Sequence, residues 1–341
     1  MLLFMTQTQR IVLARTPDGA PVAADFALEN MDLPEAELGT LLVRVLALSL
    51  DPYIGSRLQG RHMSGPAPKI GELIPGGGVA QVIESKAEGF AAGDVVVAET
   101  GWQTHALIDP AEARKVDAYV DPVSLHLGVC GMPGLTAHAS VNRLAQVREG
   151  DRVLVSSAAG PVGGTVGQLS RIAGATKVVG TAGSDEKCRL VVERYGFDDC
   201  INYRADDWQD RLADAFPDGI TVYHDNVGGK MLDAALANLA DYGRVVLCGL
   251  ISQYNLPAGQ RPSGPNPGIY ILKRAILKGL VVYDYMDEAG DFARTAARHI
   301  AEERLRFVED SADGLAAAPA QFEKLMRGDN IGKTVVQVAP L

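Results

Sequence analysis

The feature that most constrains the fold is a strand, a turn of small residues and a helix in direct succession at residues 152–167. The apolar run Val153–Val155 predicts a buried strand. The turn after it carries small residues at the spacing of a dinucleotide-binding fingerprint, namely Ala158, Gly160 and Gly163, with alanine in place of the first glycine. Such a turn lets the backbone approach a phosphate, and the N–H groups at the start of the helix then face the anion.

The residues on both sides of this turn favour a nucleotide site over the alternative, a plain structural turn. After it, apolar residues recur at helical spacing: Val162, Val166, Leu169 and Ile172. A pyrophosphate would therefore meet the free backbone N–H groups of a true helix N-terminus.

The second strand, expected at Lys177–Thr181, indicates which nucleotide is bound. An NAD site has a carboxylate at the tip of this strand, whereas here the tip reads Ala182-Gly183-Ser184. Lys187 and Arg189 follow within one turn, and a cation beside a small hydroxyl suits the 2′-phosphate of NADP. The alternative is that these charges are only the solvated first turns of a helix.

The rest of the middle region repeats the same unit of apolar strand, turn and amphipathic stretch. Strands are expected to begin 20 to 25 residues apart, near Arg152, Lys177, Cys200, Ile220 and Gly243. This spacing suits right-handed crossovers and predicts a doubly wound parallel sheet. We expect a further strand at Leu280–Tyr283 and an amphipathic helix at about Glu288–Glu303.

The first 120 residues have a different pattern. Short alternating runs are broken by proline and glycine, at Thr40–Leu48, Gly78–Glu84 and Asp94–Glu99, which predicts antiparallel strands in a small barrel. The tail predicts strands at Arg306–Glu309 and Lys333–Val338 with a helix between them. We expect the tail to return to the first domain, so that residues 1–124 and 304–341 form one domain and 125–303 the other.

Composition restricts the class of protein. The 341 residues are 47% apolar and 22% charged, without an apolar run that approaches the length of a membrane span. The net charge of −10 argues against nucleic acid as the main partner. The N-terminal run Met1–Met5 is too short for a signal peptide, and the cysteines, Cys130, Cys188, Cys200 and Cys248, lack CxxC spacing, so we expect a cytoplasmic protein.

Metal ligands are sparse in the first domain. Zinc sites need three or four ligands and usually a cysteine, but no cysteine precedes Cys130. Asp51, His62 and His105 could in principle gather a metal, although isolated histidines are more often packed or surface residues. We therefore expect no metal. Hydride transfer to a plain ketone would then lack its usual Lewis acid, whereas a conjugated enone is easier to reduce by hydride without one.

Several short phrases together carry a resemblance to a known family. They are Asp51-Pro-Tyr53, Met132-Pro-Gly-Leu-Thr-Ala137, Gly183-Ser-Asp-Glu-Lys187, Asp225-Asn-Val-Gly-Gly229, Cys248-Gly-Leu-Ile-Ser-Gln-Tyr-Asn255 and Asn330-Ile-Gly-Lys-Thr334. Over essentially its whole length the chain resembles the medium-chain dehydrogenase/reductase superfamily. Within it, the chain is most similar to the zinc-free prostaglandin reductase, leukotriene dehydrogenase and curcumin reductase group of NADPH-dependent alkenal/one oxidoreductases.

The resemblance implies a Rossmann domain and a discontinuous GroES-like β-barrel domain in a homodimer. It also implies NADPH-dependent reduction of the carbon–carbon double bond of α,β-unsaturated ketones or aldehydes, with hydride added at the β-carbon and the enolate oxygen stabilised by a hydrogen bond. Tyr254 is the implied catalytic residue, acting through the nicotinamide ribose 2′-hydroxyl; the alternative is that it packs on the cofactor as a wall.

The implied cofactor contacts lie in the turns at the carboxyl edge of the sheet and in the returning tail. Besides Tyr254, they are Thr136, Gly160, Val162, Gly163, Gly183, Ser184, Lys187, Tyr203, Asn226, Cys248, Gly249, Leu250 and Asn330. Some have structural alternatives: Asn226 as a turn residue, Thr136 as an N-cap and Tyr203 as an exposed strand end.

The substrate side is less well marked by the sequence. Candidates to line an apolar cleft are Tyr53, Met63, Trp102, His105 and Tyr270, and the Pro- and Gly-rich segment Pro257–Ile269 is expected to shape specificity. We expect a small-molecule substrate and neither nucleic acid nor membrane as partner. Quinone reduction and a non-catalytic nucleotide-binding role remain the alternatives.

Overall fold

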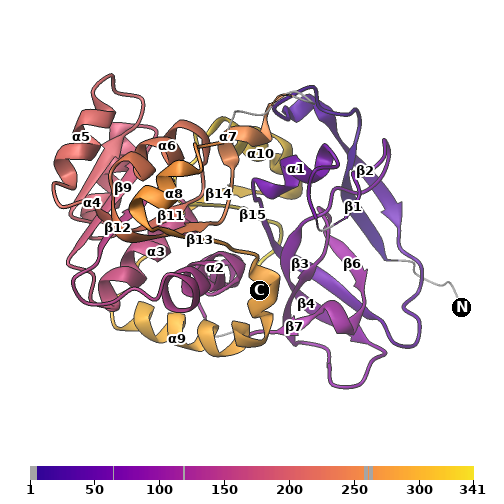
Figure 1. The fold of residues 1–341 in the computed structure, drawn as a ribbon. Helices are drawn as coiled ribbons and strands as arrows, with labels where there is room; N and C mark the ends of the chain where they lie inside the picture. The colour runs from indigo at the N-terminus through magenta and orange to yellow at the C-terminus, as the bar shows by residue number, and fades with distance from the viewer. Residues whose placement is uncertain (1–5, 64, 118–119, 257–259, 261–263) are drawn as a thin grey trace, which may run out of the picture. The chain divides into compact units, whose positions relative to one another are not determined.

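The computed structural model describes residues 6–63, 65–117, 120–256, 260 and 264–341. The chain divides into two compact units, of which unit 1 comprises residues 1–128 and 309–341 and unit 2 comprises residues 129–308 (Figure 1). Within the described part, none of the helices combines the length and the apolar character needed to cross a membrane.

Unit 2 is built on a six-stranded parallel sheet. Its strands stand in the order β10-β9-β8-β11-β12-β13, which is the 3-2-1-4-5-6 order of a dinucleotide-binding fold. Their bounds are β8 Arg152–Val155, β9 Lys177–Ala182, β10 Asp199–Asn202, β11 Ile220–Asp225, β12 Leu239–Leu247 and β13 Ile276–Gly279. The predicted doubly wound sheet is therefore confirmed.

Helices cover both faces of this sheet (Figure 1). Alternate strand residues, such as Leu154, Ile201 and Tyr223, pack on one face against α5 and α6. The α-helices of unit 2 are α2 Met132–His138, α3 Pro161–Ile172, α4 Asp185–Glu193, α5 Trp208–Ala215, α6 Gly229–Ala237, α7 Ile251–Tyr254, α8 Gly268–Lys273 and α9 Ala289–Ala301. A π-helix, η4 Ala139–Leu144, continues α2, and a 3-10 helix, η5 Val282–Glu288, precedes α9.

Unit 1 has a mainly antiparallel β architecture, as the Pro- and Gly-broken runs predict. Its larger sheet has the order β14-β15-β3-β4-β5-β7, with β6 also paired to β3, and β1 forms a hairpin with β2. The strands are β1 Gln7–Leu13, β2 Phe26–Asp32, β3 Leu41–Ser49, β4 Gly77–Ser85, β5 Val95–Glu99, β6 His105–Ile108, β7 Arg114–Lys115, β14 Glu309–Asp313 and β15 Lys333–Gln337. The helices are α1 Tyr53–Leu58 and α10 Ala318–Arg327, with 3-10 turns η1 Ala23–Asp25, η2 Pro110–Glu112, η3 Val123–Leu127 and η6 Leu315–Ala317.

Two strand predictions were wrong in position. The sixth strand of unit 2 is β13 rather than Leu280–Tyr283, and residues 282–288 form the 3-10 helix η5. The first strand of the tail is β14 rather than Arg306–Glu309. Both strands carry polar or exposed residues because they lie at sheet edges, so their apolar pattern is weak.

Candidate active site

The turn between β8 and α3 has the close packing that the fingerprint predicts. A Cβ on Gly163 would lie 2.4 Å from the carbonyl oxygen of Ser157, so only glycine fits there. Ser157 itself is in the left-handed region, with φ 53°. Helix geometry leaves the N–H groups of Val162 and Gly163 without an intrahelical acceptor, so these groups can donate to an anion. The N–H of Gly160 is already bonded to Ser157 O at 3.1 Å.

The structure also explains the alanine in place of the first glycine. Gly180 on β9 lies beside Ala158, and a Cβ at position 180 would lie 2.6 Å from the Cβ of Ala158. The backbone N–H of Ala158 is bonded to Thr181 O at 3.0 Å, which holds the turn against β9. The glycine on the neighbouring strand therefore makes room for the alanine methyl group.

Hydrogen bonds and close packing hold the residues at the tip of β9. Ser184 caps α4, with its hydroxyl accepting from the N–H of Lys187 at 3.2 Å. The carboxylate of Asp185 accepts from the side chain of Asn202 at 2.8 Å, so it is turned toward the end of β10. Tyr203 lies over Gly183, where a Cβ would come within 2.7 Å of the tyrosine hydroxyl.

The structure adds one residue that the sequence analysis missed at this tip. A Cβ on Gly183 would lie 3.5 Å from Nε of Arg204, so a basic side chain stands at this tip beside Tyr203. Arg204 makes no ion pair with a carboxylate of the described residues. Its place directly after β10 was a usable signal, but only the pairing of β10 with β9 brings it to this tip.

The loops after β11 and β12 meet at the carboxyl edge of the sheet. The N–H groups of Cys248 and Gly249 donate to Asp225 O at 2.8 and 3.1 Å, and the N–H of Ile251 donates to Asn226 O at 3.1 Å. These bonds bring Asn226, the segment 248–250 and α7 together, as the resemblance implies. Cofactors of parallel α/β sheets bind at this edge.

Tyr254 is the last residue of α7, and its hydroxyl points back toward the loop after β12. The phenolic oxygen accepts a long hydrogen bond of 3.4 Å from the N–H of Leu250, and a Cβ on Gly249 would lie at the same distance from it. Burial raises the pKa of Tyr254, so the phenol stays protonated at neutral pH. Among the described residues no acceptor takes its O–H, which is therefore available to a ligand.

A buried polar network around Asp225 stabilises the loop after β11. Asp225 is fully buried and accepts from the hydroxyls of Tyr223 and Ser156 at 2.6 and 3.0 Å, and from the N–H groups of Val227 and Gly228 at 2.9 and 3.0 Å. Burial, together with the charge of Asp225, raises the pKa of Tyr223 well above its usual value. The carboxylate thus fixes the backbone turn that carries Asn226.

His224 orients the side chain of Asn226. Its Nδ1 lies 2.7 Å from the hydroxyl of Ser140, and its Nε2 lies 3.2 Å from Oδ1 of Asn226. Burial lowers the pKa of His224 to about 4, so the ring is neutral and donates from Nε2. Since Asn226 Nδ2 also donates to Ser156 O at 2.9 Å, one amide hydrogen remains for a ligand.

Two other residues of unit 2 that we expected at the site, Thr136 and Tyr270, make contacts within unit 2. Thr136 lies inside α2, where its hydroxyl donates to Met132 O at 2.8 Å, so it is not the N-cap that the alternative interpretation suggested. Tyr270 on α8 packs partly against the core beneath the sheet. Of the segment expected to shape specificity, residues 257–259 and 261–263 lie outside the described residues.

In unit 1, a buried ion pair joins two of the phrases that carry the resemblance. Lys333 Nζ lies 2.9 Å from Asp51 Oδ1 and donates to Leu50 O at 2.9 Å.

Tyr53 lies at the start of α1, and its ring contacts the ring of His62 with 4.9 Å between centroids. Met63 is 72% exposed beside them. In the tail, Asn330 donates to Gly332 O at 3.0 Å.

Trp102 does not lie on a surface that a substrate could reach. Its side chain is 0% exposed and packs between the rings of Phe26 and Phe322, at centroid distances of 5.6 and 5.3 Å. This position assigns Trp102 to the core of unit 1, and the expectation that it lines a cleft is corrected.

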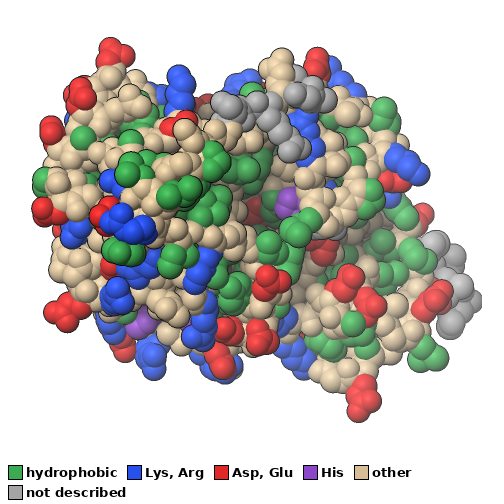
Figure 2. All heavy atoms as spheres, in the orientation of Figure 1, with side chains coloured by type: hydrophobic (Ala, Val, Ile, Leu, Met, Phe, Trp, Pro, Cys, Tyr) green, Lys and Arg blue, Asp and Glu red, His purple; other side chains and the backbone are tan. Residues whose placement is uncertain are grey.

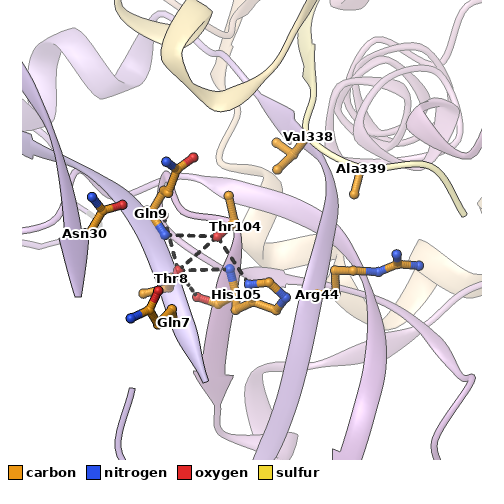
Figure 3. Close-up of a pocket in the computed structure, with 9 residues that line it drawn as sticks. All are labelled: Gln7, Thr8, Gln9, Asn30, Arg44, Thr104, His105, Val338 and Ala339. Carbon is orange, nitrogen blue, oxygen red and sulfur yellow. Dashed lines mark hydrogen bonds between the residues drawn. The ribbon is translucent and has the colours of Figure 1, made fainter. Parts of the chain in front are cut away.

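His105 lines a pocket of about 350 Å³ in unit 1 (Figure 3). Its Nδ1 is 3.2 Å from the hydroxyl of Thr104, which also accepts from the N–H of Gln9 at 3.0 Å. Burial, followed by the charge of Arg44, lowers the pKa of His105. The lining residues, Gln7, Thr8, Gln9, Asn30, Arg44, Thr104, His105, Val338 and Ala339, do not include Tyr53 or Met63.

Asp51, His62 and His105 do not form a metal-binding cluster. In the described ranges, no three side chains of His, Cys, Asp or Glu gather so that they could hold a metal ion. The carboxylate of Asp51 is instead bonded to Lys333 and to the hydroxyl of Ser49.

Comparison with known proteins agrees with this architecture. Residues 9–116 match a family described as the N-terminal domain of oxidoreductase, and residues 161–301 match one described as zinc-binding dehydrogenase. The NADPH-dependent curcumin reductase of Escherichia coli (strain K12) is 39% identical, with 98% of this chain and 97% of the relative covered. The 2-alkenal reductase (NADP(+)-dependent) of Nicotiana tabacum is 38% identical, with 97% of each covered.

The crystal structure of CurA from Vibrio vulnificus in complex with NADPH superposes with a TM-score of 0.91 at 38% identity, covering 98% of this chain and 100% of that one. Similarity of this extent, together with the Rossmann and antiparallel β units, confirms the resemblance found in the sequence. The chain belongs to the medium-chain dehydrogenase/reductase superfamily, in the group of the curcumin, prostaglandin and alkenal reductases.

Proposed function

We propose that the protein is an NADPH-dependent reductase of the activated carbon–carbon double bond of α,β-unsaturated ketones and aldehydes. The observation that carries the proposal is the position of Tyr254, a protonated phenol whose hydroxyl lies at the carboxyl edge of β12 beside Gly249. The names of the relatives support the same reaction, since curcumin and 2-alkenals both contain conjugated double bonds.

The residues of unit 2 fit NADP. Val162 and Gly163 offer backbone N–H groups to the pyrophosphate, and Asn226 offers its free amide hydrogen at the sheet edge. Tyr203 and Arg204 lie beside Gly183 at the tip of β9, and Lys187 is in the first turn of α4, so these residues would hold the 2′-phosphate. When bound, NADPH supplies the hydride. The other proposed contacts are Thr136, Gly160, Gly183, Ser184, Cys248, Gly249, Leu250 and, from unit 1, Asn330.

Tyr254 acts as a hydrogen-bond donor. As hydride reaches the β-carbon of the substrate, negative charge moves to the carbonyl oxygen. The phenol of Tyr254 would donate to the ribose 2′-hydroxyl of a bound NADPH and so help to stabilise the charge on that oxygen. Because the phenol pKa is raised by burial, Tyr254 stays neutral and does not add a repelling charge. The proton at the α-carbon would come from solvent or from a hydroxyl group.

The proposal is tested by NADPH oxidation with a simple enone in wild type and Tyr254→Phe. Loss of one transition-state donor is expected to lower kcat by about 10²-fold at saturating NADPH. Tyr242→Phe is the matched control, because Tyr242 is a 68% exposed tyrosine on β12 and should keep wild-type kcat. Equal kcat in all three proteins would reject the role of Tyr254.

The same assay distinguishes enone reduction from quinone reduction and from nucleotide binding without catalysis. An enone reductase oxidises NADPH faster with the enone than with a quinone at equal concentration. Faster turnover with the quinone would favour the quinone reductase, and binding of NADPH without turnover of either substrate would favour the non-catalytic role.

We further propose that Tyr53, Met63 and Tyr270 contribute to substrate binding, and that catalysis needs no zinc. The first point is supported by Tyr53, which contacts His62 at the start of α1, and by Met63, which follows His62 and is 72% exposed. The second is supported by the absence of any cysteine before Cys130 in the sequence, and by the engagement of Asp51 with Lys333. Full activity after dialysis against a chelator is the expected result.

A homodimer in the cytoplasm is the remaining part of the proposal. Strand β13 is at the edge of its sheet, and hydrophobic side chains gather over α8 and β13 (Figure 2). They include Ile271, Leu272, Ile276 and Leu277, which are 80, 65, 50 and 39% exposed. Pairing of β13 with its copy would cover an exposed apolar edge. Light scattering coupled to size exclusion measures the mass, and a monomer would reject this pairing.

A further inference from the structure

Two cysteines lie in contact close to the proposed 2′-phosphate site. Cys188 is on α4, one residue after Lys187, and Cys200 is on β10, three residues before Tyr203. The thiol of Cys200 hydrogen-bonds to the sulfur of Cys188. Both side chains are nearly buried, with residue exposures of 8 and 4%.

The packing of α4 on the sheet explains this contact. Cys200 is paired with Gly180 on β9, so both residues face the same side of the sheet. A Cβ on Gly180 would lie 3.0 Å from Val191 of α4, which identifies this side as the one that α4 covers. Cys188 and Val191 are the buried residues of α4, and β10 is the edge strand.

We propose that Cys188 and Cys200 are a peroxide-sensitive dithiol, and that the disulfide between them weakens binding of the 2′-phosphate of NADPH. Only the effect of the disulfide on 2′-phosphate binding rests on the proposed NADP site. Formation of the disulfide depends on the contact between the two thiols and on nothing else at the site.

Cys188 is the attacking sulfur. The hydrogen bond from Cys200 lowers the pKa of Cys188, whereas burial raises the pKa of Cys130 and of Cys248 to about 12. The Cys188 thiolate attacks one peroxide oxygen, the O–O bond breaks, and one water leaves after protonation. The sulfur of Cys200 then attacks the resulting sulfenic acid, the S–O bond breaks, and a second water carries away the other thiol proton. Two electrons pass from the pair of sulfurs to one peroxide.

The new bond would move residues that bind the coenzyme. A disulfide holds its sulfurs about 2 Å apart, closer than two thiols in van der Waals contact, so its formation would pull α4 and β10 together. The first turn of α4 carries Ser184 and Lys187, and the hydrogen bond between Asp185 and Asn202 ties this turn to the end of β10. Binding groups tolerate displacements of only about 0.5 Å, so we expect about tenfold weaker NADPH binding.

The test treats the whole reduced protein with hydrogen peroxide, blocks the remaining thiols by alkylation in denaturant, and maps peptides without reduction. Trypsin would cut on both sides of Cys188, so a protease that cleaves after Glu186 and Glu193 is used. The expected product is a cross-link between Cys188 and Cys200, lost in Cys200→Ser and kept in the matched control Cys130→Ser. No cross-link, or one that involves Cys130 or Cys248, would overturn the proposal.

The coupling is tested separately by titrating the dithiol in dithiothreitol redox buffers with and without NADP⁺. Tenfold tighter binding to the dithiol form raises its midpoint potential by about 30 mV, and NAD⁺ should not do so. An unchanged potential overturns the coupling. If Lys187→Ala weakens NADPH and NADH equally, the NADP assignment fails, while the peptide map still decides whether the disulfide forms.

Discussion

Replacing Lys333 by methionine removes one partner of the buried ion pair in unit 1. The side chains of Lys333 and Asp51 are only 4 and 10% exposed, and Nζ and Oδ1 are 2.9 Å apart. Methionine has a similar length and fills the space of the lysine stem. The change therefore isolates the loss of the ammonium group and leaves the Asp51 carboxylate buried with Ser49 as its remaining side-chain donor.

The expected loss follows from burial. Breaking a buried pair by removing one partner costs about 3–5 kcal/mol, because the other charge is left without compensation. Since the Ser49 hydroxyl stays on Asp51, we expect the lower end, about 3 kcal/mol. For a folding unit of this size, this corresponds to a drop of about 6–12 °C in the Tm of unit 1.

Urea unfolding and calorimetry measure the loss, with Lys324→Met as the matched control. Lys324 pairs with Asp310 at 2.7 Å in the same unit, but its side chain is 43% exposed, so we expect about 1 kcal/mol or less. Adding Asp51→Asn to Lys333→Met should restore part of the stability. Equal losses for Lys333→Met and Lys324→Met, or no recovery in the double variant, would refute the reasoning.

Three further predictions concern unit 2. Arg204→Ala should raise the KM for NADPH about tenfold and leave that for NADH unchanged, since one charge-assisted bond is lost; steady-state kinetics with both coenzymes decides this, and equal effects would count against a phosphate contact. Gly163→Ala should weaken both coenzymes, because its Cβ would lie 2.4 Å from Ser157 O, whereas Gly290→Ala, with its nearest neighbour at 3.7 Å, should bind normally in a fluorescence titration. His224 has a pKa of about 4 in the fold and about 6.5 when unfolded, so the unfolded chain binds more protons between these values, and stability should fall by about 3 kcal/mol as the pH drops from 6.5 to 4. Urea unfolding of His224→Gln should show a flatter pH profile over this window, and an unchanged profile would contradict the assignment.

The positions of the turns that form the proposed nucleotide site were predictable because their signals are local. The turn at Ala158–Gly163 and the tip at Gly183–Lys187 each lie within a few residues of one strand end, and parallel strands place their carboxyl ends at one edge. The prediction that Asn226 and the segment 248–250 lie at this edge is confirmed by the hydrogen bonds between their loops.

Other residues were missed or misplaced because their surroundings come from distant segments. Trp102 is next to a short strand and had the pattern of a loop aromatic, but Phe26 and Phe322 enclose it in the core. Arg204 reaches the tip of β9 only through the pairing of β10 with β9.

By itself the sequence determined the alternation of strands and helices, the glycine-containing turn between β8 and α3 and the lack of an acid at the second strand tip, since these depend on residue types a few positions apart. The tertiary structure alone decided that Lys333 meets Asp51, 282 residues earlier in the chain, that Cys188 touches Cys200, and that β13 is the exposed edge. The physical reason is that periodicity and turn chemistry act between neighbours in the chain. Contacts between distant side chains depend instead on strand order and register, which the whole fold sets through burial and backbone hydrogen bonding.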